Sequence, residues 1–171
     1  MITNVQLTTK EKYLLEDSRT HEEQCIQKYE NYANLATDAE LKAVFRKNGQ
    51  KEQEHLETIN QLLSGKVPSM GQSSSQSNQD SQGSSGQSVT SQQTTVNAKN
   101  MNTCGFNASD KDLCTDMLMT EKYVSGAYDT AIFEFKDASV RDVLNHIQKE
   151  EQKHGEAIFA YMQSKGMYKP S

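Results

Sequence analysis

The chain has 171 residues, which is typical of one domain, and a formal net charge of −5 at pH 7. Its pI is near 5.4 and its mean hydropathy is −0.83. This balance argues against nucleic acid as a partner, because phosphate binding needs clustered cations. No apolar run approaches the roughly 18 to 20 residues of a membrane span, and the N-terminus lacks a signal-peptide pattern. We therefore expect a protein made and kept in a cytoplasm, without a membrane partner.

Residues 8–65 predict a first helical hairpin, because residues of the core type recur there every three or four positions. The stretch "TDAE" (37–40) has the Thr-x-x-Glu form of a capping box and predicts the start of the second helix. Ser64, Gly65 and Pro68 end the hairpin. The first predicted stripe contains Leu15, Ser18, Glu22, Cys25, Tyr29 and Ala36, and the second contains Leu41, Val44, Phe45, Asn48, Glu52, His55, Ile59 and Leu62.

Residues 66–106 predict a flexible linker rich in Ser and Gln. Within it, 22 of the 25 residues from 71 to 95 are Ser, Gln, Gly or Thr. Such a segment buries too little apolar area to offset the entropy lost on ordering. A linker of this length can carry the chain back along helices of about 25 residues, which are near 40 Å long.

Residues 107–168 predict a second hairpin that repeats the first. With a shift of 99 positions, residues 12–66 match residues 111–165 at 14 of 55 positions. Asp137 corresponds to Asp38 and can cap the fourth helix. Two narrow hairpins should close on each other, so we predict an all-α, antiparallel four-helix bundle of the ferritin-like type. The stripes of this half contain Cys114, Met117, Glu121, Val124, Tyr128 and Phe135, then Val140, Val143, Leu144, Ile147, Glu151, His154, Ile158 and Tyr161.

Both halves place a Glu-x-x-His pair on the predicted core face, Glu52 with His55 and Glu151 with His154. Glu22 and Glu121 each lie 30 residues before the glutamate of such a pair. Four unpaired buried carboxylates would be too costly to desolvate, and Lys and Arg lie mostly off the stripes. One Glu from each of two helices and Glu-x-x-His from each of the other two form the ligand set of dinuclear carboxylate proteins.

Two iron or manganese ions are the predicted cofactors, because carboxylates and two imidazoles suit these harder ions better than structural zinc. The alternative is that the pairs are structural or exposed. Tyr29 and Tyr128 follow Glu22 and Glu121 by seven residues, so they either donate hydrogen bonds to the carboxylates or are amphipathic core aromatics. No catalytic residue is assigned.

The other two histidines and the three cysteines are not expected to bind metal. His21 and His146 fall off the stripes, which predicts surface positions. The three cysteines form no metal-type pair, so Cys25 and Cys114 fit core positions and Cys104 a loop thiol available to another chain.

The second half resembles the Coat F family of bacterial spore coat proteins, in Thr115-Asp116, Lys122-Tyr123, the "VRDVLNHIQKEE" helix and the ending "YMQSKGMY". Tyr128, Ala131 and Glu134 also carry the resemblance, which spans roughly residues 107–170. Residues 8–65 are similar to rubrerythrin in the "YENYANLA…KEQEH" pattern. This similarity implies that Glu22, Glu52 and His55 hold ligand positions, as do Glu121, Glu151 and His154.

Two functions follow as expectations. The Coat F resemblance implies a spore coat protein, synthesised in the mother-cell cytoplasm, with other coat proteins as partners and a homo-oligomer as a possible assembly. The ligand pattern predicts a carboxylate-bridged di-iron or di-manganese site in it. The alternative is a dimetal oxidoreductase of the peroxidase, catalase or oxidase kind that protects the spore; ferritin-type storage is a weaker third reading, because no assembly signal is visible.

Overall fold

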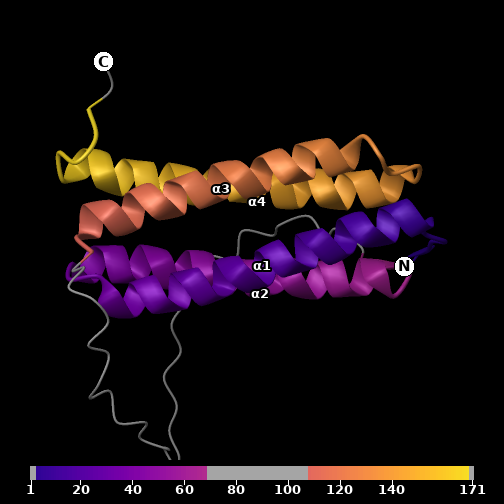
Figure 1. Cartoon of the computed structure of the whole chain (residues 1–171), viewed down its shortest axis with the longest axis horizontal. Coiled ribbons are helices and arrows are strands. Elements are labelled where there is room, and N and C mark those ends of the chain that lie inside the picture. Colours follow the sequence, from indigo (N-terminus) through magenta and orange to yellow (C-terminus); the bar gives the residue numbers. More distant parts are fainter. Residues whose placement is uncertain (1–2, 69–107, 170–171) are drawn as a thin grey trace, which may run out of the picture. The chain divides into compact units, whose positions relative to one another are not determined.

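The computed structural model describes residues 3–68 and 108–169, and these residues form a bundle of four helices (Figure 1). The predicted all-α four-helix bundle is therefore confirmed. The linker predicted over most of 66–106, and Cys104 within it, lie outside the described residues. The helices are α1 (Thr9–Leu35), α2 (Ala39–Leu63), α3 (Asp110–Ile132) and α4 (Ala138–Ser164).

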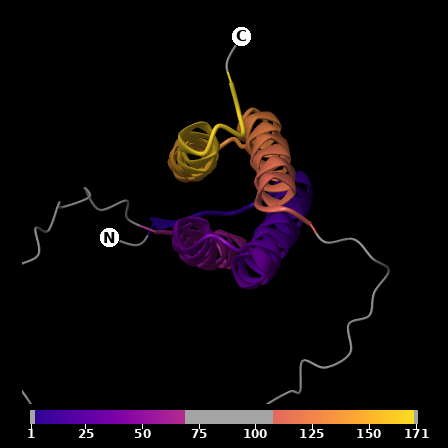
Figure 2. The ribbon, with the colours of Figure 1, turned by 90° about the vertical axis from the view of Figure 1, so that its left-hand side faces the viewer.

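The helices pack as two antiparallel hairpins, α1 on α2 and α3 on α4, which meet through α1–α3 and α2–α4 contacts (Figure 2). An ion pair joins Lys10 near the start of α1 to Glu134 just after α3. Tyr32, near the end of α1, donates a hydrogen bond to Asp116 near the start of α3. Helices α1 and α3 are therefore antiparallel, so α2 and α3 point the same way.

Side-chain caps explain where the helices begin. The predicted capping box at Thr37 is wrong, because Asp38 is the N-cap of α2 and its carboxylate accepts from the Glu40 N–H. The hydroxyl and N–H of Thr37 instead donate to Asp110, each over 2.8 Å. Asp137 caps α4 as predicted.

Two reciprocal capping boxes occur elsewhere in the described residues. Thr8 and Glu11 form one at the start of α1, and Ser109 and Asp112 form the other at the start of α3. In each box the cap hydroxyl accepts from the backbone N–H three residues on, while the acidic side chain accepts from the cap N–H.

The predicted stripes form the core, and only Val44 among them is half-buried. The apolar residues gather in two clusters, one containing Ile59, Val124 and Leu144, the other Phe45 and Met117. On α2, α3 and α4 the buried glutamates and histidines lie between the residues of these clusters. The apolar packing on both sides of this polar layer holds the helices together around it.

A short antiparallel ribbon, absent from the sequence prediction, joins the N-terminus to the end of α2. It pairs β1 (Thr3–Asn4) with β2 (Lys66–Val67). Gly65 precedes β2 with a positive φ of 78°, where a side chain would be strained. The range predicted as linker therefore begins with two residues of a strand.

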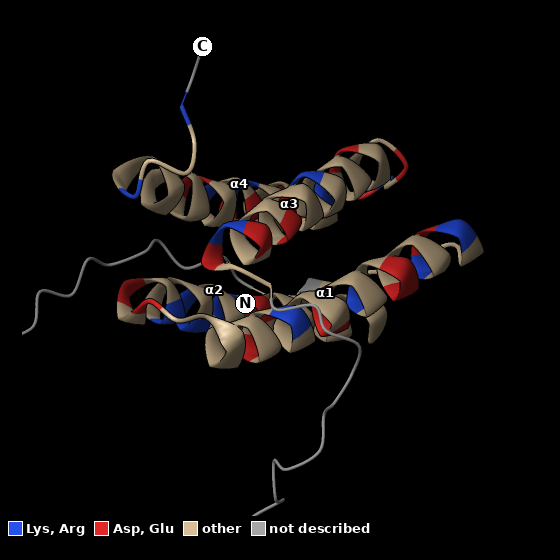
Figure 3. Cartoon of the chain, turned by 60° about the vertical axis from the view of Figure 1, so that its left-hand side comes forward, with Lys and Arg blue, Asp and Glu red and all other residues tan. Residues whose placement is uncertain are grey.

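The outer surface carries charges of both signs on all four helices (Figure 3). Within residues 3–68 and 108–169, no helix combines the length and apolar character that a membrane span requires.

Candidate metal centre

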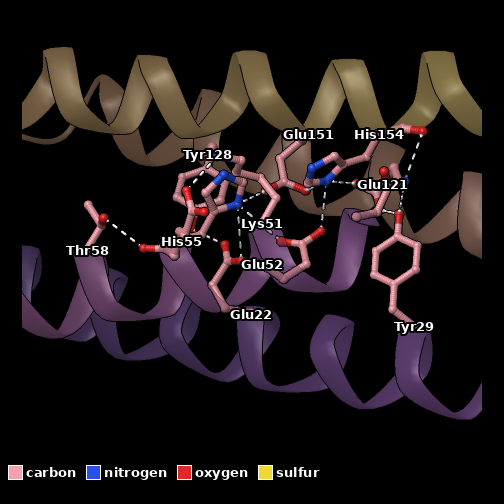
Figure 4. Close-up of polar contacts among 12 residues, drawn as sticks. Glu22, Tyr29, Lys51, Glu52, His55, Thr58, Glu121, Tyr128, Glu151 and His154 are labelled. Carbon is pink, nitrogen blue, oxygen red and sulfur yellow. Dashed lines mark hydrogen bonds and ion pairs between the residues drawn. The ribbon is translucent and has the colours of Figure 1, made fainter. Parts of the chain in front are cut away.

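Each helix contributes to one polar layer in the middle of the bundle. Glu22 comes from α1 and Glu121 from α3, while α2 and α4 contribute the two Glu-x-x-His pairs. All six side chains point toward one another between the hairpins (Figure 4). Each of the six residues is at most 4% exposed. The structure thus brings together every residue that the sequence predicted for this site.

The six residues form two groups of four that share Glu52 and Glu151. Glu22 and His55 complete one group, which we call site A, and Glu121 and His154 complete the other, site B. In each group one ligand atom per residue lies within 4.8 Å of the others. Because the shared glutamates belong to both groups, the arrangement has the form of two neighbouring cation sites bridged by carboxylates.

The Nδ1 atoms of both histidines face the carboxylates. His55 Nδ1 lies 2.9 Å from Glu151 Oε1 and 3.2 Å from Glu52 Oε2. His154 Nδ1 lies 2.9 Å from Glu52 Oε1 and 3.7 Å from Glu121 Oε2. The two imidazole rings stack with centroids 5.6 Å apart. One nitrogen from each histidine is therefore placed where a cation between the carboxylates would need it.

Several buried carboxylate oxygens have no hydrogen-bond partner among the described residues. They are Oε2 of Glu22, Oε2 of Glu121 and both oxygens of Glu151. Glu151 Oε1 is close to His55 Nδ1, but the contact lacks the angles of a hydrogen bond. Leaving such atoms buried and unpaired costs about 1–3 kcal/mol each, and more for charged groups. The donor set of four carboxylates and two imidazoles therefore fits a pair of divalent cations.

In the metal-free state, protons offset part of the negative charge. Burial raises the pKa of Glu22 to about 7. Burial, with the charges of Glu52, Glu22 and Glu121, raises the pKa of Glu151 well above its ordinary value. Burial alone would also raise the pKa of Glu52, but hydrogen bonds from His154 and His55 lower it instead.

The two imidazoles keep their protons because the carboxylates around them stabilise the positive charge. Burial alone would lower the pKa of His55, yet Glu151, Glu22 and Glu52 raise it to about 12. Burial likewise opposes the protonation of His154, but Glu121 and Glu52 raise its pKa to about 9. The metal-free cluster thus carries protons at the positions where cations would otherwise neutralise it.

The two tyrosines donate to the candidate ligands across the hairpins. Tyr29 on α1 donates to Glu121 Oε1 on α3, and Tyr128 on α3 donates to Glu22 Oε1 on α1. Burial raises the pKa of both phenols, and the facing carboxylates add to the effect, so both remain hydrogen-bond donors. Of the two readings of these tyrosines, the geometry favours the one in which they orient the carboxylates.

Asn48 is a further polar residue of the site, and its role was not predicted. Its amide donates to the Tyr29 hydroxyl over 3.1 Å and to the His154 carbonyl over 3.5 Å. The sequence did contain a signal for this role, because an Asn on a core-facing stripe needs a buried hydrogen-bond partner. The residue 99 positions later is Ile147, which has no such donor, so the two ends of the site differ here.

The remaining candidates lie away from the polar layer or are inert. His146 is exposed as predicted, whereas His21 is half-buried with its ring 5.4 Å from that of Tyr123. Cys25 and Cys114 are buried free thiols, which matches their predicted core positions. Burial raises the pKa of both thiols, so neither is a ready nucleophile.

The fold and the site together describe a four-helix bundle with a buried, twofold-repeated cluster of carboxylates and imidazoles. Residues 109–171 match the family model described as the Coat F domain. This match covers α3 and α4, the half of the chain in which the sequence resemblance was found, and includes three of the six candidate ligands. No curated protein and no solved structure matches the chain.

Proposed function

We propose that the bundle holds a carboxylate-bridged pair of iron or manganese ions. Glu22 and His55 would hold the ion of site A, and Glu121 and His154 the ion of site B. Glu52 and Glu151 would bridge the two ions. The observation that carries this proposal is the sharing of Glu52 and Glu151 between two buried groups of ligand atoms. The choice of ion rests on the chemistry of the donors, which are oxygen and imidazole nitrogen and include no thiolate.

The Coat F match supports a place for the protein in the spore coat. Residues 109–171 carry the match and make up the second hairpin. On this basis the protein would be synthesised in the mother-cell cytoplasm, and its partners would be other coat proteins. Detection of the chain in fractionated spores tests this part. Recovery with the coat fraction is expected, and recovery only from the spore core or the mother cell would contradict it.

Thermal unfolding with added Fe(II) or Mn(II) tests the metal part. A ligand that binds only the folded state raises the melting temperature. We expect a rise for the wild-type chain and none for a variant in which Glu52 and Glu151 are both replaced by Gln. Glu54→Gln and Glu57→Gln, on the exposed face of α2, serve as matched controls because they lie outside the cluster. A wild-type melting temperature indifferent to both metals contradicts the proposal.

A dimetal oxidoreductase is the second candidate function, and a groove lined in part by Glu121 and Glu151 favours it. A redox-active ion pair supplies two-electron chemistry, while the carboxylates of this chain would hold it and can accept protons. The simplest balanced reaction converts two hydrogen peroxide molecules into two water molecules and one dioxygen molecule, without an added reductant. Dioxygen release from peroxide by the metal-loaded protein, and not by the Glu52→Gln variant, is the expected result. No release from protein with both sites filled would contradict this activity.

A further inference from the structure

A groove of about 720 Å³ lies between α3 and α4, beside the candidate metal centre. Glu121 and Glu151, both almost fully buried, form part of its lining. Leu118, Phe159 and Tyr168 provide apolar surface along it. The groove therefore runs along the second hairpin beside Glu121, a ligand of site B, and Glu151, a ligand of both sites, while Glu121 Oε2 and both oxygens of Glu151 remain buried beneath it.

Small residues keep this groove open. Ser125 and Gly126 on α3 and Gly155 on α4 all line it. A Cβ atom added at Gly126 would meet no atom within 4 Å, and one at Gly155 would lie 3.6 Å from Leu118 Cδ1. Both glycines are within helices, where Gly costs about 1 kcal/mol relative to Ala. The space beside them is thus available to something other than a side chain.

The corresponding surface of the first hairpin differs, although its sequence is a repeat of the second. The residues 99 positions before Ser125, Gly126 and Gly155 are Ile26, Gln27 and Leu56, which are all large. A pocket between α1 and α2 has a volume of only about 240 Å³, and neither Glu22 nor Glu52 lines it. The pocket between α3 and α4 is thus lined by two candidate ligands and the pocket between α1 and α2 by none, while a pocket of about 320 Å³ between α2 and α4 is lined by His154 of site B.

A second difference between the repeats falls at the same site. Asn48 donates to the Tyr29 hydroxyl, which donates in turn to Glu121 of site B. At site A, Tyr128 donates to Glu22, and the residue in the place of Asn48 is Ile147. The groove and the asparagine are independent departures from the repeat, and both distinguish site B from site A.

We propose that the α3–α4 groove is a substrate pocket beside site B, because Glu121 lines it whereas neither Glu22 nor His55 does. This inference rests on the proposed metal centre. The volume lies in the range of pockets for organic molecules, about 300–1,000 Å³, and exceeds what peroxide or dioxygen needs. Most of its exposed lining is apolar, although Lys122, Asp129 and Glu156 also line it, and this favours an uncharged body. A hydroxyl or carbonyl group of the substrate would lie against the buried side chains of Glu121 and Glu151. The substrate class is an uncharged organic molecule with an apolar body and one such polar group.

Binding of 1-octanol to the full-length, metal-free protein tests the groove itself. We expect changes in the backbone amide resonances of Ser125, Gly126 and Gly155. Gly126→Leu and Gly155→Leu should weaken binding at least about tenfold, because each leucine fills the groove. Both variants should fold, since an added Cβ atom meets open space at Gly126 and an ordinary contact at Gly155, and Leu favours helix. Gln27→Leu, at the position matching Gly126, should bind octanol as the wild type does.

Loading with manganese then tests which end of the bound octanol molecule lies nearer to the metal centre. Paramagnetic relaxation by Mn(II) should be stronger for the octanol protons beside the hydroxyl than for its terminal methyl group. Octanol that perturbs other residues, binds the leucine variants unchanged, or points its methyl group toward the metal would overturn the inference. Metal content, measured separately on the same samples, distinguishes the two failures. If the chain binds two ions but no octanol, the pocket is contradicted and the metal centre is supported. If it binds octanol but no metal, the metal centre is contradicted.

Discussion

Tyr128 donates its hydroxyl hydrogen bond to Glu22, a residue of the other hairpin. Tyr29 of the first hairpin likewise donates to Glu121 of the second, so each hairpin donates one such hydrogen bond to the other. Each tyrosine follows a glutamate of its own helix by seven residues yet orients the glutamate of its neighbour. The two hairpins therefore complete each other's half of the site, and neither half is complete alone.

Replacing Tyr128 by Phe should weaken metal binding at site A more than at site B. The change removes the hydrogen bond that orients Glu22 and leaves the apolar ring in place. Loss of such a supporting partner typically lowers metal affinity about 10–100-fold. Titration with Mn(II) measures the effect, and Tyr13→Phe, at an exposed position of α1, is the control. Equal affinities for wild type and Tyr128→Phe would show that the hydroxyl does not support a ligand.

Replacing Glu22 by Gln should stabilise the metal-free protein and weaken its response to metal. Glu22 is fully buried, and its Oε2 has no partner while Oε1 accepts from Tyr128. The amide keeps that acceptor and removes a buried charge beside Glu52, which favours folding by about 1–3 kcal/mol. Thermal unfolding in a chelator and then in Mn(II) provides both readings. A metal-free melting temperature below that of the wild type would contradict this prediction.

Glu11 should make folding stability depend on pH. Burial alone would raise its pKa, but the N–H groups of Thr8 and Lys136 donate to its carboxylate and lower the pKa below 4.5. Because the folded-state pKa is depressed, this stabilisation is fully present above the unfolded pKa of about 4.5 and is lost as the pH falls through the folded value. Glu11→Gln should therefore cost about 1–3 kcal/mol at neutral pH and progressively less below about pH 4.5.

Urea unfolding of wild type and Glu11→Gln across this pH range measures the difference. Asp112→Asn changes the corresponding box on α3, where the acidic residue is exposed, and should cost less. A Glu11→Gln penalty that stays constant down to acidic pH would contradict the electrostatic explanation.

Loss of a bridging ligand and loss of a terminal ligand should have different effects. Glu52 belongs to both groups of candidate ligands, whereas His55 belongs to one. Glu52→Ala should reduce the occupancy of both sites together, while His55→Ala should chiefly empty site A. Metal content measured over a range of Mn(II) concentrations distinguishes the two patterns. If Glu52→Ala and His55→Ala each removed a single ion, Glu52 would not be a bridge.

The sequence predicted the helices and the six clustered residues because periodic burial and repetition are local or pairwise signals. Spacing placed Tyr29 on the face of Glu22, but spacing within one helix does not reveal which neighbouring helix a side chain reaches. The crossed hydrogen bonds to Glu121 and from Tyr128 therefore appear only in three dimensions. Thr37 matched a capping pattern, yet Asp38 beside it takes the cap and Thr37 bonds to Asp110 of the other hairpin.

The groove was not predicted from the sequence, for a related reason. Gly126 and Gly155 lie on different helices 29 residues apart, and their shared opening depends on how α3 packs on α4. Comparison with Gln27 and Leu56 in the repeat would have indicated the difference in size. It would not have shown that the space reaches Glu121.

Elemental analysis of the purified chain after anaerobic loading with Fe(II) or Mn(II) and removal of free metal tests the central claim most directly. The two groups of ligand atoms predict about two ions per chain. They also predict almost none when Glu52 and Glu151 are both replaced by Gln. A wild-type chain that retains neither iron nor manganese would contradict the metal centre and leave a bundle with a proton-neutralised polar layer.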